Sequence, residues 1–229
     1  MNATWQSDDG SVRLFLGSAL DVLPHVRADC VVTDPPYGMA HKSGHWPGDF
    51  AIEGDLDTCV RDAALALVPD GTPMAVFGNW RCAKPKGTRN CLVWDKTDGT
   101  GPGMGDLRQL WGHSHEEIYI IGNWFKGEKK RLGSVIRTTD GIRSLAVKVG
   151  HPTPKPLSIV SALVDASPPG CCVLDMFMGS GPTIEAAIRL GRKAVGVELS
   201  PEYFWDICVP RAKRALAERA AQLPFVEGK

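Results

Sequence analysis

Short apolar runs alternate with longer amphipathic segments along this chain, and this alternation constrains the fold more than any other feature. The run CVVT at 30–33 is a clear example, since small or apolar residues at every position are typical of a strand buried on both faces. We expect strands at 12–17, 30–34, 73–78, 91–96, 116–122, 171–176 and 193–199. We expect helices at 21–26, 55–68, 155–167, 182–191 and 201–222. Such alternation predicts an α/β fold, with a mostly parallel sheet covered by helices on both faces.

Length and composition favour one globular domain. The 229 residues suffice for a single core, and no linker-like segment divides them, so we expect one catalytic domain over 1–229. No apolar stretch approaches the roughly 20 residues of a membrane span, and the N-terminus lacks the features of a signal peptide. The seven cysteines form no CxxC pair, which argues against a zinc site and a disulfide framework. We therefore expect a reduced, cytoplasmic protein without metal.

The charge is unevenly distributed although the total is zero, with 26 basic and 26 acidic residues. The middle of the chain is basic, and the run Lys129, Lys130 and Arg131 is its densest part. A basic patch can bind phosphates, but it can equally be a solvated face. Both interpretations stay open at this point.

A glycine-rich turn follows one of the expected strands. In LDMFMGSGPT (174–183), Asp175 ends the strand and a helix begins near Pro182. Glycines permit close approach of a ligand to the backbone, and a helix N-terminus favours an anion. Glu198 ends the next strand, where an acidic side chain can accept hydrogen bonds from ribose hydroxyls. The pattern indicates a nucleotide-type site, with an ordinary strand-to-helix turn as the alternative.

The stretch TDPPYG (33–38) ends another buried strand on a charge. Asp34 would face the ligand crevice of a parallel sheet. Pro35 and Pro36 fix the backbone and leave carbonyls as rigid acceptors, and Tyr37 offers a flat face. Acceptors beside an aromatic ring suit an exocyclic amino group on a planar heterocycle. They would stabilise positive charge developing on that nitrogen, so the stretch predicts electrostatic catalysis.

These residues resemble a known family. TDPPYG is similar to the catalytic motif of amino-group DNA methyltransferases, which make N6-methyladenine or N4-methylcytosine with S-adenosylmethionine (SAM). DMFMGSGPT resembles their SAM-binding motif, HPTPKP (151–156) the element before it, and GVELSPEYF (196–204) the ribose-binding strand. The motif order resembles the β group, a circular permutation of the methyltransferase fold. The resemblance implies a Rossmann-like SAM-dependent methyltransferase fold with a mixed, mostly parallel, seven-stranded sheet.

The resemblance also implies roles for individual residues. Catalysis would rest on Asp34, Pro35, Pro36 and Tyr37. The cofactor would be held by Ser18, Asp34, His151, Thr153, Lys155, Asp175, Phe177, Gly179, Ser180, Gly181, Thr183, Glu198 and Leu199. DNA would be contacted by His41, His45, Trp46, Lys129, Lys130 and Arg131. Two positions depart from the family pattern, since Ser18 stands where an aspartate is usual and Pro182 where a threonine or serine is usual. Short DNA-recognition insertions are expected at 39–54, 97–115 and 123–150.

The implied reaction is methyl transfer from SAM to the N6 amino group of adenine in double-stranded DNA, with the base flipped from the duplex. N4-cytosine methylation is the alternative, and the motif could also serve RNA or a protein glutamine amide. A SAM-binding module without catalysis is the alternative of another class. A homodimer is left open. His113 and His115 are too few ligands for a metal, and Trp5 and Trp80 are expected to be packing residues.

Overall fold

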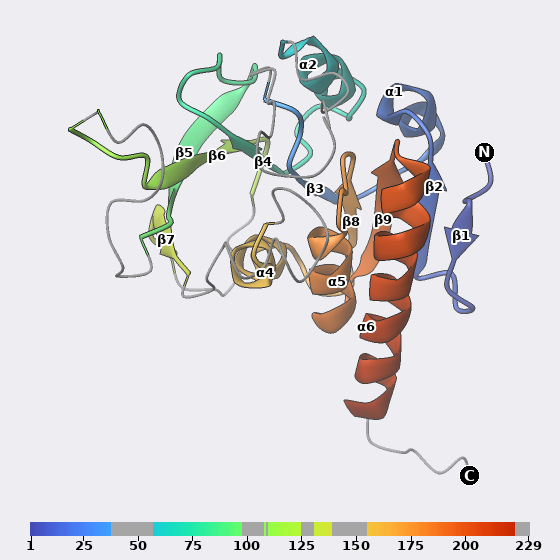
Figure 1. The fold of residues 1–229 in the computed structure, drawn as a ribbon. Helices are drawn as coiled ribbons and strands as arrows, with labels where there is room; N and C mark the ends of the chain where they lie inside the picture. Colours follow the sequence, from blue (N-terminus) through green and yellow to red (C-terminus); the bar gives the residue numbers. More distant parts are fainter. Residues whose placement is uncertain (38–56, 98–107, 109, 125–130, 139–154, 223–229) are drawn as a thin grey trace.

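A computed structural model describes residues 1–37, 57–97, 108, 110–124, 131–138 and 155–222, and its ribbon is one twisted sheet flanked by helices (Figure 1). The strands are β1 (Trp5–Gln6), β2 (Val12–Leu16), β3 (Cys30–Thr33), β4 (Met74–Gly78), β5 (Thr88–Asp95), β6 (His115–Ile121), β7 (Val135–Arg137), β8 (Cys172–Asp175) and β9 (Lys193–Glu198). Their order across the sheet is β1-β2-β9-β8-β3-β4-β6-β5-β7. The expected α/β class is therefore confirmed.

The sheet has nine strands in the described part of the chain, so the expected number of seven is wrong. The seven expected strands form the contiguous centre, from β2 to β5. The two additional strands lie at the edges, where β1 pairs antiparallel with β2 and β7 pairs parallel with β5. Their lengths of two and three residues are too short to show an alternating pattern in the sequence. Strand β7 also lies inside the segment 123–150, where a short DNA-recognition insertion rather than a strand was expected.

Helices cover both faces of the sheet. They are α1 (Ala19–Val22), α2 (Cys59–Ala66), α4 (Leu157–Asp165), α5 (Pro182–Arg189) and α6 (Val209–Gln222), with a 3-10 turn η1 (Leu23–His25) and a π-helical segment η2 (Tyr203–Cys208). On β3, Val31 packs in the core on the side of α1 and α2. Its neighbours Cys30 and Val32 pack in the core on the side of α4, α5 and α6. This alternation explains why the strand is apolar throughout, since both of its faces are buried.

The last helix begins differently from the expectation. A single helix was expected over 201–222, but the first part is the π-helical η2, which α6 continues. Phe204 and Cys208 of η2 are buried in the same core as α5. A π-helical segment is a local widening of the helix and has no sequence period of its own, so the pattern could not distinguish it from an α-helix.

The strand connections change direction between β8 and β3, which makes this position the topological switch point of the sheet. From β8 the chain passes through α5 to β9, on one side, whereas from β3 it passes through α2 to β4, on the other. Ligands of open α/β sheets bind beyond the carboxyl ends of the strands at such a switch point. Strand β6 runs antiparallel to β4 and β5, so its amino end lies at the same edge of the sheet. That edge therefore collects the residues after β3, β4, β8 and β9 and those before β6.

The described helices include none with the length and apolarity needed to cross a membrane. All seven cysteines have free thiols, of which Cys30, Cys171 and Cys208 are buried.

Candidate active site

The ends of β3 and β8 are joined directly at the switch point. The hydroxyl of Thr33 donates a hydrogen bond of 2.7 Å to Asp175 Oδ1, and the backbone N–H of Phe177 donates to the same oxygen at 3.2 Å. Asp175 is buried, and this burial raises its pKa to about 6. Asp175 therefore fixes the turn after β8 against the strand that carries Asp34.

Hydrogen bonds fix both Asp34 and Tyr37, the first and last residues of the Asp34–Tyr37 segment. The Tyr37 hydroxyl donates to Asp34 Oδ1 at 2.7 Å, so the two side chains are joined across Pro35 and Pro36. The thiol of Cys82, beyond β4, donates to the Tyr37 backbone carbonyl at 2.8 Å. The Asp34 side chain is 28% exposed, so it is only partly covered by the protein. The structure thus brings a carboxylate and an aromatic ring together at the carboxyl edge.

Lys155, which comes just before α4 and is far from Asp34 in the sequence, forms an ion pair with Asp34. Lys155 is 7% exposed, and its ammonium donates to Asp34 Oδ2 at 2.6 Å. The ammonium also lies 5.3 Å from the centroid of the Tyr37 ring and 3.4 Å from Glu116 Oε2. The resemblance implies that Lys155 contacts the cofactor, which stays a prediction, and in the structure Lys155 contacts Asp34, Tyr37 and Glu116.

Two residues of this cluster were missed by the sequence analysis. Glu116, at the start of β6, lies 3.4 Å from the Tyr37 hydroxyl, and Lys96 donates to Glu116 Oε1 at 2.6 Å. Asp34, Lys155, Glu116 and Lys96 thus form a chain of alternating charges. The available signal was the acidic Glu116, which comes before the apolar residues of this strand. The sequence analysis interpreted Glu116 only as the start of the strand.

Burial and charge shift the pKa values in this cluster in opposite directions. Burial raises the pKa of Asp34, although the Lys155 ammonium opposes this effect. Burial also acts to raise the pKa of Glu116, but Lys155 and Lys96 outweigh it and leave that pKa lowered. Burial acts to lower the pKa of Lys155, but the two carboxylates outweigh it and leave that pKa raised. Burial and Asp34 hold the pKa of Tyr37 well above its usual value, so it stays a neutral hydrogen-bond donor.

The glycine turn after β8 wraps around Glu198. Gly179 and Gly181 have φ values of 49° and 75°, in the region that favours glycine. The N–H of Gly179 donates to Glu198 Oε2 at 2.8 Å, and the N–H of Ser200 donates to Oε1 at 2.9 Å. Burial raises the pKa of Glu198 to about 7. Each oxygen keeps a lone pair, so this carboxylate can accept further hydrogen bonds from a ligand.

Other predicted cofactor residues lie around this turn with different exposures. Ser180 and Thr183 are buried, and their hydroxyls are engaged within the protein, Ser180 with Arg211 at 3.4 Å and Thr183 with Asp175. Phe177 is half-buried, and Leu199 is 45% exposed beside Glu198. Ser180 and Thr183 therefore support the shape of the turn, whereas Leu199 offers an open apolar surface.

Ser18 lies at the neighbouring strand end. The N–H of Gly17 donates to the carbonyl of Glu198 at 2.9 Å, which brings the end of β2 beside the end of β9. The Ser18 hydroxyl accepts the N–H of Leu20 at 3.2 Å and so caps α1. Ser18 remains a predicted cofactor contact. Its hydroxyl oxygen is the acceptor in this cap, so the cap does not use the hydroxyl proton.

Several predicted residues lie outside the described part of the chain. They are His41, His45, Trp46, Lys129, Lys130, His151 and Thr153. Arg131, the remaining member of the basic run, is exposed. The expectation for Trp5 is confirmed, since it packs against the core, but Trp80 is 55% exposed and is not a packing residue. Among the described residues, no group of three or more His, Cys, Asp or Glu side chains could hold a metal.

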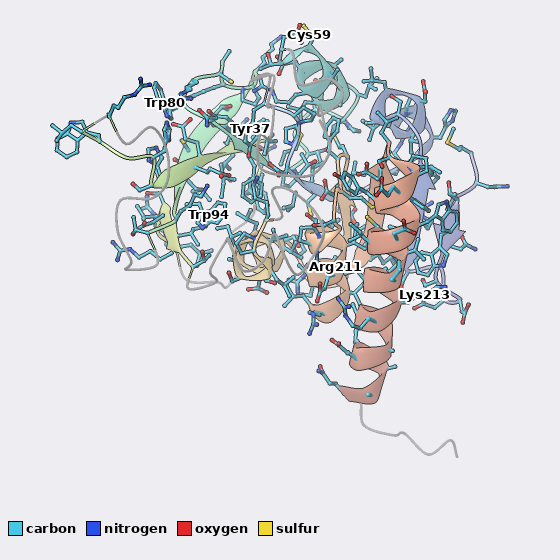
Figure 2. All side chains as sticks on the ribbon, viewed as in Figure 1. Tyr37, Cys59, Trp80, Trp94, Arg211 and Lys213 are labelled. Carbon is cyan, nitrogen blue, oxygen red and sulfur yellow. The ribbon has the colours of Figure 1, made fainter. Side chains whose placement is uncertain are left out.

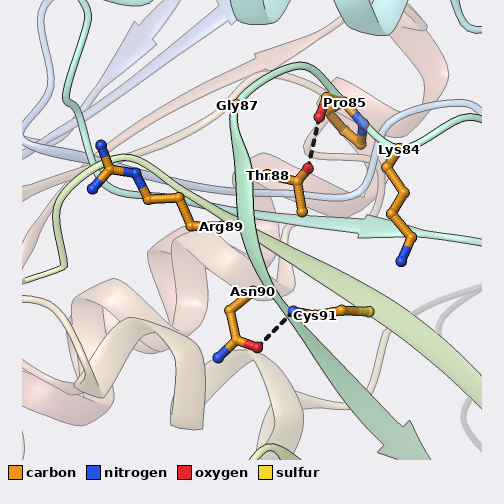
Figure 3. A pocket seen from close by; sticks show the side chains of 7 residues that line it. All are labelled: Lys84, Pro85, Gly87, Thr88, Arg89, Asn90 and Cys91. Atoms are coloured by element: carbon orange, nitrogen blue, oxygen red, sulfur yellow. Dashed lines mark hydrogen bonds between the residues drawn. The ribbon is translucent and has the colours of Figure 1, made fainter.

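A concave region lies at the amino edge of the parallel strands, opposite to the edge that carries Asp34. It is an open hollow around the turn before β5 and the first residues of that strand (Figure 3). The Thr88 hydroxyl donates to the Pro85 carbonyl at 2.7 Å, and Lys84 and Arg89 contribute positive charge. Because Asp34 lies at the carboxyl edge, this hollow is separate from the cluster described above.

Comparison with known proteins agrees with the fold. The family model described as "DNA methylase", of the N6/N4 type, matches residues 94–207. M1.HpyAVI, solved with SAM, superposes with a TM-score of 0.61 at 19% identity, over 90% of this chain and 98% of that chain. The cytosine-N4-specific PvuII DNA methyltransferase gives a TM-score of 0.58 at 16% identity, over 95% and 87%. These likenesses confirm the methyltransferase fold.

Two relatives in sequence support the assignment to a family. The type II methyltransferase M1.MboII of Moraxella bovis is 24% identical over 80% of this chain and 89% of its own length. The "Putative methylase YubD" of Escherichia coli K12 is 43% identical over 195 residues, which are 79% of this chain and 80% of that protein. With the family model and this relative in agreement, the chain belongs to the N6/N4 DNA methylase family.

Proposed function

We propose that this protein transfers a methyl group from SAM to the exocyclic N6 amino group of adenine in DNA. The observation that carries the proposal is the pairing of Asp34 and Tyr37 at the switch point, beside the glycine turn that wraps Glu198. An acceptor next to an aromatic ring suits a planar base with an amino group. The adjacent turn suits a nucleoside-like cofactor.

The residues around the glycine turn fit SAM. Glu198 presents a buried carboxylate of raised pKa, which donors such as ribose hydroxyls would stabilise in its charged form. Leu199 offers an exposed apolar surface next to it, suited to a flat ring. Gly181 has a left-handed backbone conformation and is the N-cap of α5. The glycine turn therefore leads directly into the N-terminus of this helix. SAM would supply an activated methyl group bound to a sulfonium.

Asp34 and Tyr37 would act on the base. Each oxygen of Asp34 has one described partner, Tyr37 on Oδ1 and Lys155 on Oδ2, so lone pairs remain for an amino group. The amino nitrogen would form a bond to the methyl carbon as the carbon–sulfur bond breaks, and one amino proton then leaves to Asp34 or to solvent. Tyr37 would stack on the base and keep its own proton. No covalent intermediate with the protein is needed.

Adenine is preferred over cytosine because of the Asp-Pro-Pro-Tyr sequence at 34–37, which the sequence resemblance associates more often with adenine enzymes. N4-cytosine methylation is the second candidate, supported by the likeness in fold to the cytosine-N4-specific PvuII enzyme. Both bases offer an amino group beside a ring nitrogen, so the site chemistry serves either. The residues predicted to contact DNA, among them the exposed Arg131, would bind its phosphates.

The test is nucleoside mass spectrometry of unmethylated DNA incubated with the protein and SAM. We expect N6-methyladenine, formed about a hundredfold or more slowly when Asp34 is replaced by alanine. N4-methylcytosine as the sole product would establish the second candidate. SAM binding without a methylated nucleoside from any DNA would refute the proposed reaction.

A further inference from the structure

An exposed aromatic and basic surface borders the Asp34–Tyr37 segment. We call it the Trp80 platform, and its members are Trp80, Arg81, Trp111, His113 and His115. Trp80 is 55% exposed and Trp111 is 83% exposed, and Leu110 next to it is 86% exposed. Single exposed apolar side chains are common on proteins, but a group of large ones usually marks a binding surface.

The central pair of the platform has a fixed orientation. The indole N–H of Trp80 donates to His113 Nε2 at 2.9 Å. The two ring centroids are 5.5 Å apart, and the ring planes are inclined by only 19°. His115 follows, with its ring centroid 6.3 Å from that of His113. The hydrogen bond thus holds an exposed indole face in place before any partner binds, which lowers the entropy cost of binding.

Positive charge surrounds these rings. The Arg81 guanidinium lies 5.3 Å from the centroid of the Trp80 ring. The pKa of His113 is lowered, first by partial burial and then by the nearby cationic side chain of Arg81. The neighbouring carboxylate of Glu116 is already paired with Lys96 at 2.6 Å. A partner that combines flat rings with negative charge would match this surface.

The platform is connected to the active site from two strands. On the side of β4, Cys82 follows Trp80 and Arg81 and donates to the Tyr37 carbonyl. On the side of β6, Glu116 follows His115 and lies 3.4 Å from the Tyr37 hydroxyl. Tyr37 and Trp80 lie on the same side of the molecule, away from Arg211 and Lys213 of α6 (Figure 2). A strand of nucleic acid whose base enters beside Tyr37 would therefore pass over the platform.

We propose that the Trp80 platform binds DNA by stacking an unpaired base on Trp80, with a phosphate at Arg81. The inference rests on the proposed function, because a base that reaches Tyr37 must leave the duplex and its neighbours lose a stacking partner. Aromatic side chains beside cations serve this purpose in proteins that bind single strands, because every base has a flat face. The platform would stabilise the opened DNA.

The test compares DNA binding of the wild-type protein with Trp80→Ala, Trp80→Phe and a control, Trp205→Ala. Trp205 is also an exposed tryptophan, at 47%, but it lies on η2. The probes are a short fluorescein-labelled deoxyadenosine strand and the same strand annealed to its complement, measured by fluorescence anisotropy without SAM. We expect Trp80→Ala to weaken binding of the single strand by roughly five- to 150-fold, and the duplex less. Trp80→Phe should restore most of the affinity, because it keeps a ring.

The salt dependence separates stacking from phosphate contact. Trp80→Ala should leave the slope of log affinity against log salt unchanged, whereas Arg81→Gln should reduce it by roughly 0.7 for a single strand. Equal single-strand affinities for Trp80→Ala, Trp205→Ala and wild type would overturn the inference, even if the wild type methylates DNA. A wild type that methylates no DNA would instead refute the proposed function, so the two failures are distinguishable.

Discussion

Replacing Lys155 with methionine tests the electrostatics of the active site most directly. The Lys155 ammonium is buried, 2.6 Å from Asp34 and 3.4 Å from Glu116. A neighbouring cation lowers the pKa of an aspartate by about 1–3 units, so its loss should raise the pKa of Asp34 by a similar amount. This corresponds to about 1.4–4 kcal/mol of differential stabilisation. Because burial already raises this pKa, the loss of the Lys155 ammonium would raise it further and increase the protonated fraction of Asp34 at any given pH.

The assay is the pH profile of kcat/KM for DNA methylation at saturating SAM. The proposed role of Asp34 requires its ionised form, so we expect activity to be lost as the pH falls through the pKa of this carboxyl. The acidic limb should therefore move to higher pH by about 1–3 units in Lys155→Met. The control is Lys96→Met, whose ammonium pairs with Glu116, and it should move the limb less. Because breaking a buried pair can cost about 3–5 kcal/mol of stability, thermal unfolding is measured in parallel.

One result would refute this reasoning. An unchanged acidic limb in Lys155→Met, combined with a large loss of SAM affinity by calorimetry, would show that Lys155 serves the cofactor. That outcome would favour the role implied by the sequence resemblance over the contacts in the structure.

Three further predictions follow from individual contacts. Asp34→Ala should reduce the methylation rate about a hundredfold or more by removing one preorganised acceptor, with SAM affinity nearly unchanged, and single-turnover kinetics and calorimetry check this. Gly181→Val should abolish SAM binding in a folded protein, because valine is strained at φ 75°, and a normal circular dichroism spectrum with unchanged SAM affinity would contradict it. Glu198 has a pKa of about 7, so SAM affinity should rise as the pH increases through that value and the carboxyl ionises. Glu198→Gln should remove this pH dependence in calorimetric titrations, and a persisting dependence would exclude Glu198 as its source.

Local patterns predicted the centre of the fold and the three strand ends that carry the main candidates. Asp34, Asp175 and Glu198 each end an apolar strand, so parallel strands had to bring them to one edge. The structure places them there, with Thr33 and Gly179 linking the elements. These positions follow from periodicity and chain direction, which a single sequence contains.

The sequence could not predict contacts that depend on the pairing of distant strands. Glu116 reaches Tyr37 because β6 inserts antiparallel between β4 and β5, which no local pattern reveals. Lys155 reaches Asp34 from 121 residues away in the sequence. Trp80 was assigned to packing because large aromatic residues usually are buried, but here it follows β4 at the exposed edge.

The reversed direction of β6 explains both the ion network and the Trp80 platform. The residues of β4 and β5 at the carboxyl edge are those at the ends of these strands, whereas β6 contributes its beginning. Glu116 thereby enters the chain of charges around Asp34, and His113 and His115 meet Trp80 beyond β4. Had β6 been parallel, its apolar end around Ile121 would occupy this edge in place of the Glu116 carboxylate. The antiparallel strand β6 therefore adds polar side chains beside the switch point, and the same strand joins the proposed catalytic segment to the proposed DNA surface.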